Sequence, residues 1–250
     1  MKLPRVIDET YRVAWGDLRF FRMNALQILL SCLVGPMLYI AAFGYGLGSA
    51  MEQGTDEYLR FLIPGIVSMA TLSTTFSFIA SKVFIQRVYH GSFDELVLCP
   101  IRYSSIVLGK AVIGLVRGML SCAIIMIVGL LVVGDLLLSP FLILLIFTST
   151  LTFSFLGVIA GMLAKKHNTL SVFSSLVITP MTFFSGTIFS IHDVPQTIAY
   201  AIYALPLTHP TLSIRATMLG TEIPWLSVIV LFAYCVIFYL AAYYLVRRRR

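Results

Sequence analysis

The sequence predicts an all-α integral membrane protein with six transmembrane helices. Of its 250 residues, 59% are hydrophobic and only 12% are charged, whereas a soluble domain carries about 45–50% apolar and about 25% charged residues. The apolar residues also fall in long uninterrupted blocks, and ~20 residues of α-helix suffice to cross ~30 Å of hydrocarbon. No soluble domain separates these blocks, so residues 1–250 are predicted to form a single transmembrane domain.

Six apolar blocks meet the length requirement for a transmembrane helix. The fifth is the least apolar because it is rich in Ser and Thr. Between the fifth and the last block, residues 191–224 are moderately apolar and are interrupted by prolines. We expect this external segment to form re-entrant helices that dip into the membrane without crossing it. The predicted spans are 23–48, 61–83, 106–134, 140–164, 169–190 and 225–246.

Basic residues concentrate on one side of these spans. With six crossings both termini share that side, which receives 16 of the 18 Lys and Arg residues, including Arg117 inside the third span; only Arg60 and Arg215 fall on the other side. Because Lys and Arg accumulate in cytoplasmic loops, both termini are predicted to be cytoplasmic. Within residues 1–22, the pattern over 4–22 predicts an amphipathic helix on the inner surface, with Trp15 at the interface.

Several classes of function lack their usual residues in this sequence. The basic residues lie between apolar blocks and not along one face, which argues against a nucleic-acid partner. The Cys and His spacings predict no metal site, and no GxSxG or HExxH motif occurs. The spans contain no acidic residue, so we expect a transport path that is polar but without fixed charge. A GxxxxGK[ST] phosphate loop is also missing, so active transport would take its energy from a partner.

The loop 86–104 between the second and third spans carries a short predicted helix. Ser92 and Glu95 have the S-x-x-E spacing of a capping box, which predicts a helix that begins at Ser92. Pro100 should end it, because the residue before a proline is pushed out of the helical region. The residues alone leave two readings open: a rigid knob on the cytoplasmic face, or a surface loop with a good cap.

Two segments resemble a known family. Residues 91–110, GSFDELVLCPIRYSSIVLGK, are similar to the coupling-helix loop of type-2 ABC exporter permeases. Residues 183–220, FFSGTIFSIHDVPQTIAYAIYALPLTHPTLSIRATMLG, resemble that family's block before the last span. The sequences PLTH and TMLG within this block look closest to lipooligosaccharide exporters of the nodulation-factor kind, although drug and polysaccharide exporters share much of the block.

The resemblance implies a permease subunit in a prokaryotic plasma membrane. It implies a homodimer in contact with membrane lipid and with two separate ATPase subunits, which would hold ATP and Mg; this chain would bind no cofactor. The cargo would be amphipathic, lipid-linked or a glycan. Asp94 and Glu95 would meet basic residues of the ATPase, with Phe93, Leu96 and Val97 as apolar contacts; alternatively, Glu95 only caps its own helix. The implied docking residues are Ser92, Phe93, Asp94, Glu95, Leu96, Val97 and Leu98.

Hydroxyl stripes on the second and fifth spans are candidates for the transport path, because those spans line the conduit in the family that the chain resembles. The simpler alternative is that each hydroxyl bonds its own helix backbone and eases close packing. GxxxG pairs at Gly44/Gly48, Gly114/Gly118 and Gly157/Gly161 indicate close packing within the chain or at a dimer face. The stripe residues are Ser68, Thr71 and Thr75, and Ser171, Ser175, Thr179 and Thr182.

The external segment is expected to act as a gate. Phe189 precedes it, Pro195 should lie in the first turn of a first short helix, and Pro206 and Pro210 should flank the break before a second. Arg215 either meets a lipid or substrate phosphate or snorkels to the interface. Two other classes remain as alternatives to the permease: a membrane-embedded lipid-processing enzyme, and a passive channel or scaffold.

Overall fold

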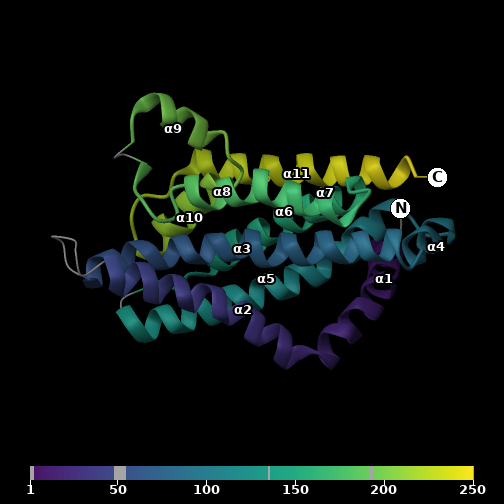
Figure 1. Ribbon diagram of the computed structural model, residues 1–250, viewed down its shortest axis with the longest axis horizontal. Coiled ribbons are helices and arrows are strands. Elements are labelled where there is room, and N and C mark those ends of the chain that lie inside the picture. Colours follow the sequence, from purple (N-terminus) through teal and green to yellow (C-terminus); the bar gives the residue numbers. More distant parts are fainter. Residues whose placement is uncertain (1–2, 48–54, 135, 192–193, 250) are drawn as a thin grey trace.

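All regular elements in the described part of the chain are helices. The computed structural model describes residues 3–47, 55–134, 136–191 and 194–249 (Figure 1). The all-α prediction is confirmed. The elements are α1 (Leu3–Met23), α2 (Ala25–Tyr39), η1 (Ile40–Leu47, a π-helix), α3 (Thr55–Val88), α4 (Ser92–Leu98), α5 (Tyr103–Val133), α6 (Pro140–Leu163), α7 (His167–Phe173), η2 (Ser174–Ile178, a π-helix), α8 (Thr179–Phe184), α9 (Gln196–Tyr203), α10 (Thr208–Leu219) and α11 (Trp225–Arg247).

Five helical segments of the described chain are long and apolar enough to cross a membrane. They correspond to the first, second, third, fourth and sixth predicted spans, with ends that differ by a few residues. Their limits follow from ordinary helix signals: Ser139 accepts a hydrogen bond from the Leu142 amide at the start of α6, and Gly134 follows the end of α5 with a φ of 81°. The segments are Ala25–Ala42, Glu57–Val88, Tyr103–Val133, Pro140–Leu163 and Trp225–Arg247.

The fifth predicted span is shorter than expected and is not uniformly α-helical. Helical structure runs from α7 through η2 to α8 and ends at Phe184, so the predicted end at residue 190 is wrong. Gly186, with a φ of 69°, turns the chain directly after the helix. The π-helical turn lies just before Pro180, whose ring disturbs the preceding α-helical hydrogen bonds. At 1.5 Å per residue the segment is about 27 Å long, close to the thickness of the hydrocarbon core.

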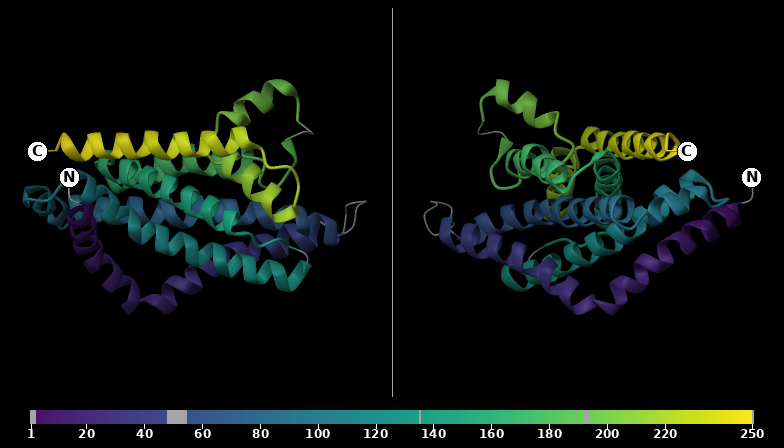
Figure 2. Two further views of the ribbon diagram at one scale, coloured as in Figure 1. Left: turned by 180° about the vertical axis from the view of Figure 1, so that it is seen from behind. Right: turned by 45° about the vertical axis from the view of Figure 1, so that its right-hand side comes forward.

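Helix α3 lies at the centre of the bundle, between α5 and α6, as both views in Figure 2 show. Its side chains contribute to all three apolar clusters of the core. Ile63, Phe76 and Phe84 are among its fully buried residues. Hydroxyls join the central helices as well, since the Thr71 and Ser149 side chains lie 2.8 Å apart between α3 and α6. Such small polar contacts stabilise helix pairs inside a membrane.

Two of the three predicted GxxxG pairs pack within the chain. A Cβ added at Gly114 would lie 2.6 Å from Ile79 Cγ1, and one added at Gly118 would lie 2.5 Å from Thr75 Oγ1. Gly157 and Gly161 on α6 likewise face α3. These glycines therefore let α5 and α6 approach α3 closely. Gly48, in the Gly44/Gly48 pair, lies outside the described residues.

Helix α1 docks against α5 by a buried charge cluster. The Asp17 carboxylate lies 3.0 Å from the Lys110 ammonium and 3.1 Å from the Lys82 ammonium, and it accepts a hydrogen bond from the Gln86 side chain at 3.2 Å. Asp17 is only 5% exposed. One carboxylate thus ties α1 to both α3 and α5, which places the N-terminal helix firmly on the bundle.

A second carboxylate of α1 caps the start of α5. Glu9 Oε2 accepts hydrogen bonds from the Arg102 amide at 3.2 Å and from the Ser105 hydroxyl at 2.9 Å. These two bonds, the amide first, lower the pKa of Glu9. The opposite face of α1 presents Tyr11 and Trp15, whose rings lie 5.6 Å apart. Val13, on the inner face of α1, is buried against Gly109 of α5.

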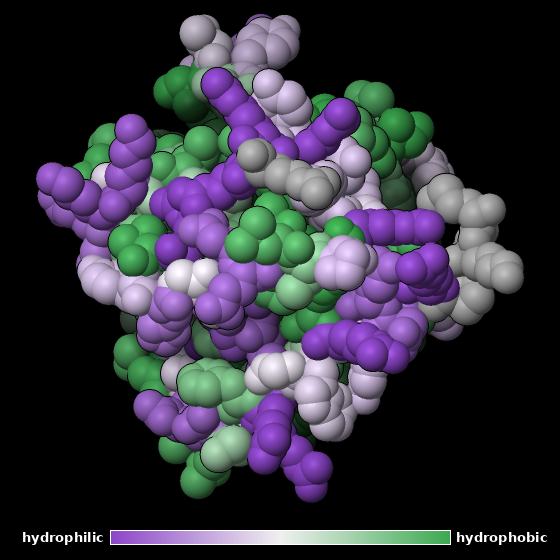
Figure 3. All heavy atoms as spheres, turned by 90° about the vertical axis from the view of Figure 1, so that its right-hand side faces the viewer, coloured by the Kyte–Doolittle hydropathy of each residue, from purple (hydrophilic) through white to green (hydrophobic). Residues whose placement is uncertain are grey.

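One end of the bundle is rich in hydrophilic and basic side chains. Figure 1 shows both chain termini and α4 at one end, and α9 and α10 towards the other. Hydrophilic side chains cover much of the first end, as seen in Figure 3. Basic residues from several loops gather there, among them exposed Lys165, Lys166 and Arg249. The distribution matches the basic asymmetry of the sequence.

Candidate functional site

Helix α4 begins at Ser92 and ends at Leu98, directly before Cys99 and Pro100, as predicted. The capping box, however, does not form. Gly91, with a φ of 67°, holds the N-cap position, and its carbonyl accepts the Asp94 amide at 3.0 Å. A glycine adopts this left-handed conformation at little cost. The Glu95 side chain makes no capping bond and is exposed, so its carboxylate is free to face solvent or a partner.

The two sides of α4 have different roles. Phe93 is fully buried and Val97 nearly so, both in the cluster formed by α3, α5, α6 and α11. The resemblance implied that these two residues contact an ATPase, whereas in the structure they are buried and anchor the helix to the bundle. Leu98 is 82% exposed and Glu95 is exposed beside it, while Leu96 is half-buried. The outward surface of α4 is therefore smaller than predicted and combines acidic residues with one large apolar side chain.

The C-terminus contacts this outward surface. Arg249 Nη1 donates a hydrogen bond to Asp94 Oδ1 at 2.6 Å, and both side chains are partly exposed. Beside α4, the loop from Cys99 to Ser104 and Tyr243 of α11 enclose a depression of about 550 Å³. Ser92 turns inward, and its hydroxyl lies 3.5 Å from the Gln86 carbonyl. The docking candidates thus reduce to Asp94, Glu95 and Leu98, with Leu96 at their edge.

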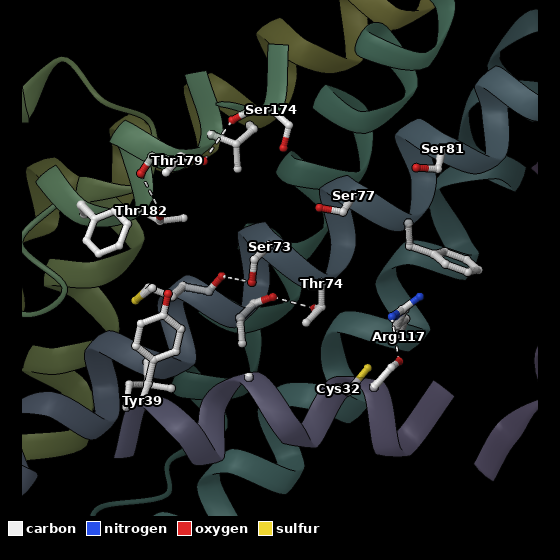
Figure 4. Close-up of a pocket in the computed structure, with 18 residues that line it drawn as sticks. Cys32, Tyr39, Ser73, Thr74, Ser77, Ser81, Arg117, Ser174, Thr179 and Thr182 are labelled. Atoms are coloured by element: carbon white, nitrogen blue, oxygen red, sulfur yellow. Dashed lines mark hydrogen bonds between the residues drawn. The ribbon is translucent and has the colours of Figure 1, made fainter. Parts of the chain in front are cut away.

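A groove of about 590 Å³, lined by hydroxyl groups and by apolar side chains, opens beside α3, between α2 and the segment η2–α8 (Figure 4). Ser73, Ser77 and Ser81 follow one another along α3 at a spacing of four residues and share one helix face. Figure 4 shows Thr179 and Thr182 above this row and Tyr39 and Cys32 below it. Apolar walls from α2, α3 and α8 complete the groove. This arrangement suits a ligand with both polar and apolar parts.

The structure selects a different stripe of α3 from the one predicted. Ser68, Thr71 and Thr75 are fully buried and face α5 and α6, away from the groove. The Ser68 hydroxyl donates to the Pro64 carbonyl at 2.9 Å, and the Thr71 hydroxyl donates to the Ser68 carbonyl at 2.7 Å. Ser68 and Thr71 thus bond their own helix backbone, as in the simpler alternative. The Thr75 hydroxyl is buried against Gly118 and has no hydrogen-bond partner among the described residues.

On the fifth predicted span, part of the hydroxyl stripe does line the groove. Thr179 and Thr182 contribute to its wall together with Ser174, which was not predicted. Ser171 and Ser175 are exposed and lie outside the groove lining. The π-helical turn η2 changes the register along this segment, so a stripe drawn with a constant α-helical period loses its alignment across Ser174–Ile178.

A charged residue in the groove was missed. Arg117 of α5 lines it, and its guanidinium carbon lies 4.5 Å from the centre of the Phe78 ring. One Nη donates to the Ser31 hydroxyl at 3.1 Å. We predicted a transport path without fixed charge, whereas this groove contains one charged side chain. The available signal was Arg117 itself, since an ionisable residue in the middle of an apolar span usually has a function.

The external segment forms two short helices, α9 and α10, as predicted. Pro195 is the N-cap of α9, one position before the first turn. Pro206 lies in the break between the helices, but Pro210 falls in the first turn of α10, where a missing N–H does no harm. Phe189 is half-buried in the non-helical stretch after α8. Helix α10 packs against α3, α6 and α11, so this helix belongs to the bundle.

Arg215 of α10 acts as an internal clamp and not as a free cation. Its guanidinium donates to the Phe61 carbonyl at 3.3 Å and to the Thr187 carbonyl at 3.0 Å. It also lies over the Phe61 ring, 3.7 Å from the centre. The side chain is only 8% exposed, so neither a phosphate contact nor snorkelling describes it. Arg215 instead holds the loop after α8 against α3.

Comparison with known proteins agrees with this architecture. The sequence model of the ABC-2 type transporter family matches residues 9–219. The chain is 26% identical over 243 residues to the inner membrane transport permease YadH of Escherichia coli (strain K12), covering 93% of this chain and 91% of that protein. It is 30% identical over 210 residues to Nodulation protein J of Rhizobium leguminosarum bv. trifolii, covering 83% and 78%. A third alignment, to Nodulation protein J of Rhizobium meliloti (strain 1021), shows 26% identity over 246 residues and covers 94% of each protein.

These similarities confirm the resemblance seen in the two sequence segments, including the likeness to the nodulation group. The matched region contains α4, the groove and α10. The five long apolar helices agree with a protein that resides in a membrane. The chain belongs to the ABC-2 type transporter family and is a membrane-spanning transport subunit.

Proposed function

We propose that this chain is the permease of an ATP-driven exporter and that two separate ATPase subunits drive it by contacting α4. The main support is that one side of α4 is buried in the bundle while the other side is exposed. Phe93 and Val97 fix the helix to the core while Glu95 and Leu98 face outward. A short helix anchored in this way transmits a push on its outer face to the bundle, because packed cores deform little.

In the proposed orientation, the end that carries α4 and both termini faces the cytoplasm of a prokaryotic cell. The gathering of Lys and Arg at that end supports it. The chain then crosses the inner membrane six times, with α7, η2 and α8 as the fifth crossing. The face of α1 that carries Tyr11 and Trp15 would rest in the inner leaflet, because aromatic residues favour the membrane interface.

The proposed working unit contains two copies of this chain. The groove is open along one side of α3, and a second copy would close it into a path between the subunits. Its mixture of hydroxyls with apolar walls favours an amphipathic, lipid-linked or glycan cargo. A membrane-embedded enzyme and a passive channel gain no specific support from this arrangement, and neither gives α4 a role.

The docking proposal predicts that Leu98→Asp weakens capture of the ATPase. Leu98 is 82% exposed, so the substitution leaves folding within about 0.5 kcal/mol of wild type, while a charge at the centre of an apolar contact disrupts binding. The measurement is co-purification of the tagged permease with its ATPase, expressed together, followed by a binding titration in nanodiscs. We expect at least a tenfold loss of affinity.

A matched control is Tyr200→Asp on α9, which is 76% exposed at the opposite end of the bundle. It should bind the ATPase like wild type. Unchanged affinity in Leu98→Asp, or an equal loss in both variants, contradicts docking on α4.

A further inference from the structure

Arg117 stands at the middle of a membrane-spanning helix. It lies 14 residues from the start of α5, which has 31 residues, and so about 21 Å along a helix of about 46 Å. A charged side chain at this depth is expensive unless something compensates it. Figure 4 shows it across the serine row of α3 from Thr179 and Thr182. The guanidinium therefore faces the same groove as the hydroxyls.

No carboxylate in the described part of the chain forms an ion pair with Arg117. The nearby Asp17 is occupied by Lys82 and Lys110. Among the described residues, Arg117 donates one hydrogen bond, to Ser31, although a guanidinium has five N–H donors. Its Nε is buried and has no partner among the described residues. Burial keeps Nε out of reach of a ligand, whereas the Nη groups lie at the surface of the groove, where their remaining N–H donors can bind one.

The surroundings of Arg117 define the shape of such a ligand. Phe78 stacks with the guanidinium and forms an apolar wall, and Phe183 and Ile178 line the far side. Beyond Phe78 and Ser81 the groove continues into a second depression of about 410 Å³. Besides Phe78 and Ser81, this depression is lined by Phe20, Ile85 and Lys82 and by the polar residues Asp17, Gln86 and His90, and its surface is mostly apolar. The space next to Arg117 is thus long and largely apolar, with polar groups at its centre.

We propose that Arg117 is an anion-binding residue of the groove, and that it binds the phosphate, sulfate or carboxylate headgroup of an acylated cargo. Planar guanidinium groups bind oxyanions through paired N–H donors. The serines of α3 then bond the neighbouring polar part, and the acyl chain lies against Phe78 and the second depression. That the bound molecule is cargo rests on the proposed function. The binding of the anion itself needs no ATPase.

The test measures how fast a cysteine placed inside the groove reacts, with and without a bound ligand. Ser77 is exposed in the groove, so Ser77→Cys, in a chain whose four native cysteines are replaced, reports occupancy by its rate of reaction with N-ethylmaleimide. Purified protein in zwitterionic nanodiscs is titrated with dodecyl phosphate, dodecylphosphocholine and dodecyl glucoside. We expect dodecyl phosphate to protect position 77 at about tenfold lower concentration than the other two, the effect of a charge-assisted hydrogen bond.

Variants at Arg117 identify the residue responsible. Arg117→Gln should abolish the preference for dodecyl phosphate while protection by dodecyl glucoside stays the same, which shows that the groove is intact. Arg117→Lys retains the charge and should keep most of the preference. The control Arg19→Gln, an exposed basic residue of α1, should behave like the unsubstituted chain. A preference that survives in Arg117→Gln, or is absent from the start, overturns the proposal.

Two further arms separate the sources of the anion. A dodecyl oligosaccharide with one phosphate represents cargo, and didecanoyl phosphatidylglycerol represents a bilayer lipid. Stronger protection by the oligosaccharide supports the cargo assignment, and stronger protection by phosphatidylglycerol contradicts it. Arg117→Gln should still capture the ATPase, because Arg117 lies about 21 Å along α5 from its start beside α4. Failure of anion binding and failure of ATPase docking therefore give different results.

Discussion

Replacement of Asp17 by Ala is expected to release α1 from the bundle. The carboxylate is 5% exposed and lies 3.0 Å from the ammonium of Lys110, which is itself 3% exposed. Removing one partner of a buried ion pair costs about 3–5 kcal/mol, because the other charge remains buried. With about 1.4 kcal/mol for each factor of ten, the equilibrium between docked and released α1 shifts by about two to three and a half orders of magnitude.

Spin labels on Arg12 of α1 and Leu120 of α5, both at exposed positions, report this release as a distance distribution by electron double resonance. The wild-type chain should give one narrow distance, and Asp17→Ala should add a broad population. The double variant Asp17→Ala/Lys110→Met should recover part of the narrow distance, because it also removes Lys110, the more deeply buried of the two ammonium groups that pair with Asp17. A narrow distribution in the single variant, or no recovery in the double, refutes the reasoning.

Three other results are expected. Hydrogen bonds lower the pKa of Glu9 in the folded protein. The carboxylate of Glu9 should therefore stabilise the docking of α1 fully above its pKa in the unfolded chain, about 4.3, and this stabilisation should be lost as the pH falls through the lower pKa of the folded state. Glu9→Gln should remove this pH dependence from the same distance measurement. Gly114→Ala should lower thermal stability by about 1–3 kcal/mol through overpacking, whereas Gly35→Ala, with no atom within 4 Å, should not. A membrane-impermeant maleimide should reach exposed Cys99 only in inverted vesicles, and Tyr200→Cys only in intact cells; the reverse pattern contradicts the orientation.

Much of the fold was predictable because a helix that crosses a membrane must have a minimum length and an apolar composition. Five long apolar blocks became five long helices with nearly the predicted ends. The start and end of α4 were also predicted correctly. Pro100 predicted the end, but the start was predicted from a Ser92/Glu95 capping box that does not form, and Gly91 holds the N-cap position instead. In the fifth span the helix ends six residues earlier than predicted, because Gly186 turns the chain within an apolar run.

The groove was harder to predict because α3 carries two polar stripes. One contains Thr71 and Thr75 and the other Ser73 and Ser77, and both repeat with a helical spacing. Which stripe faces inward depends on contacts with α5 and α6, where glycines such as Gly118 admit the hydroxyl of Thr75. That information lies in pairs of residues far apart in the sequence.

The direction of single side chains was hidden for the same reason. The pattern of α4 does not reveal that Phe93 points into the bundle and Leu98 away from it, because a helix of two turns has apolar residues on both sides. The surroundings of the two arginines Arg215 and Arg117 could not be predicted from the sequence either. Arg215 looked free and is held by two backbone carbonyls, whereas Arg117 looked incidental and lines the groove.

The most direct test of the central claim is photocrosslinking from position 98 of the permease to its ATPase. A benzophenone amino acid replaces Leu98 at the exposed end of α4, and a second chain carries it in place of Tyr200 at the opposite end of the bundle. We expect a crosslink to the ATPase from position 98 and none from position 200. Absence of the crosslink from position 98, or its appearance from position 200, would contradict a permease driven through α4.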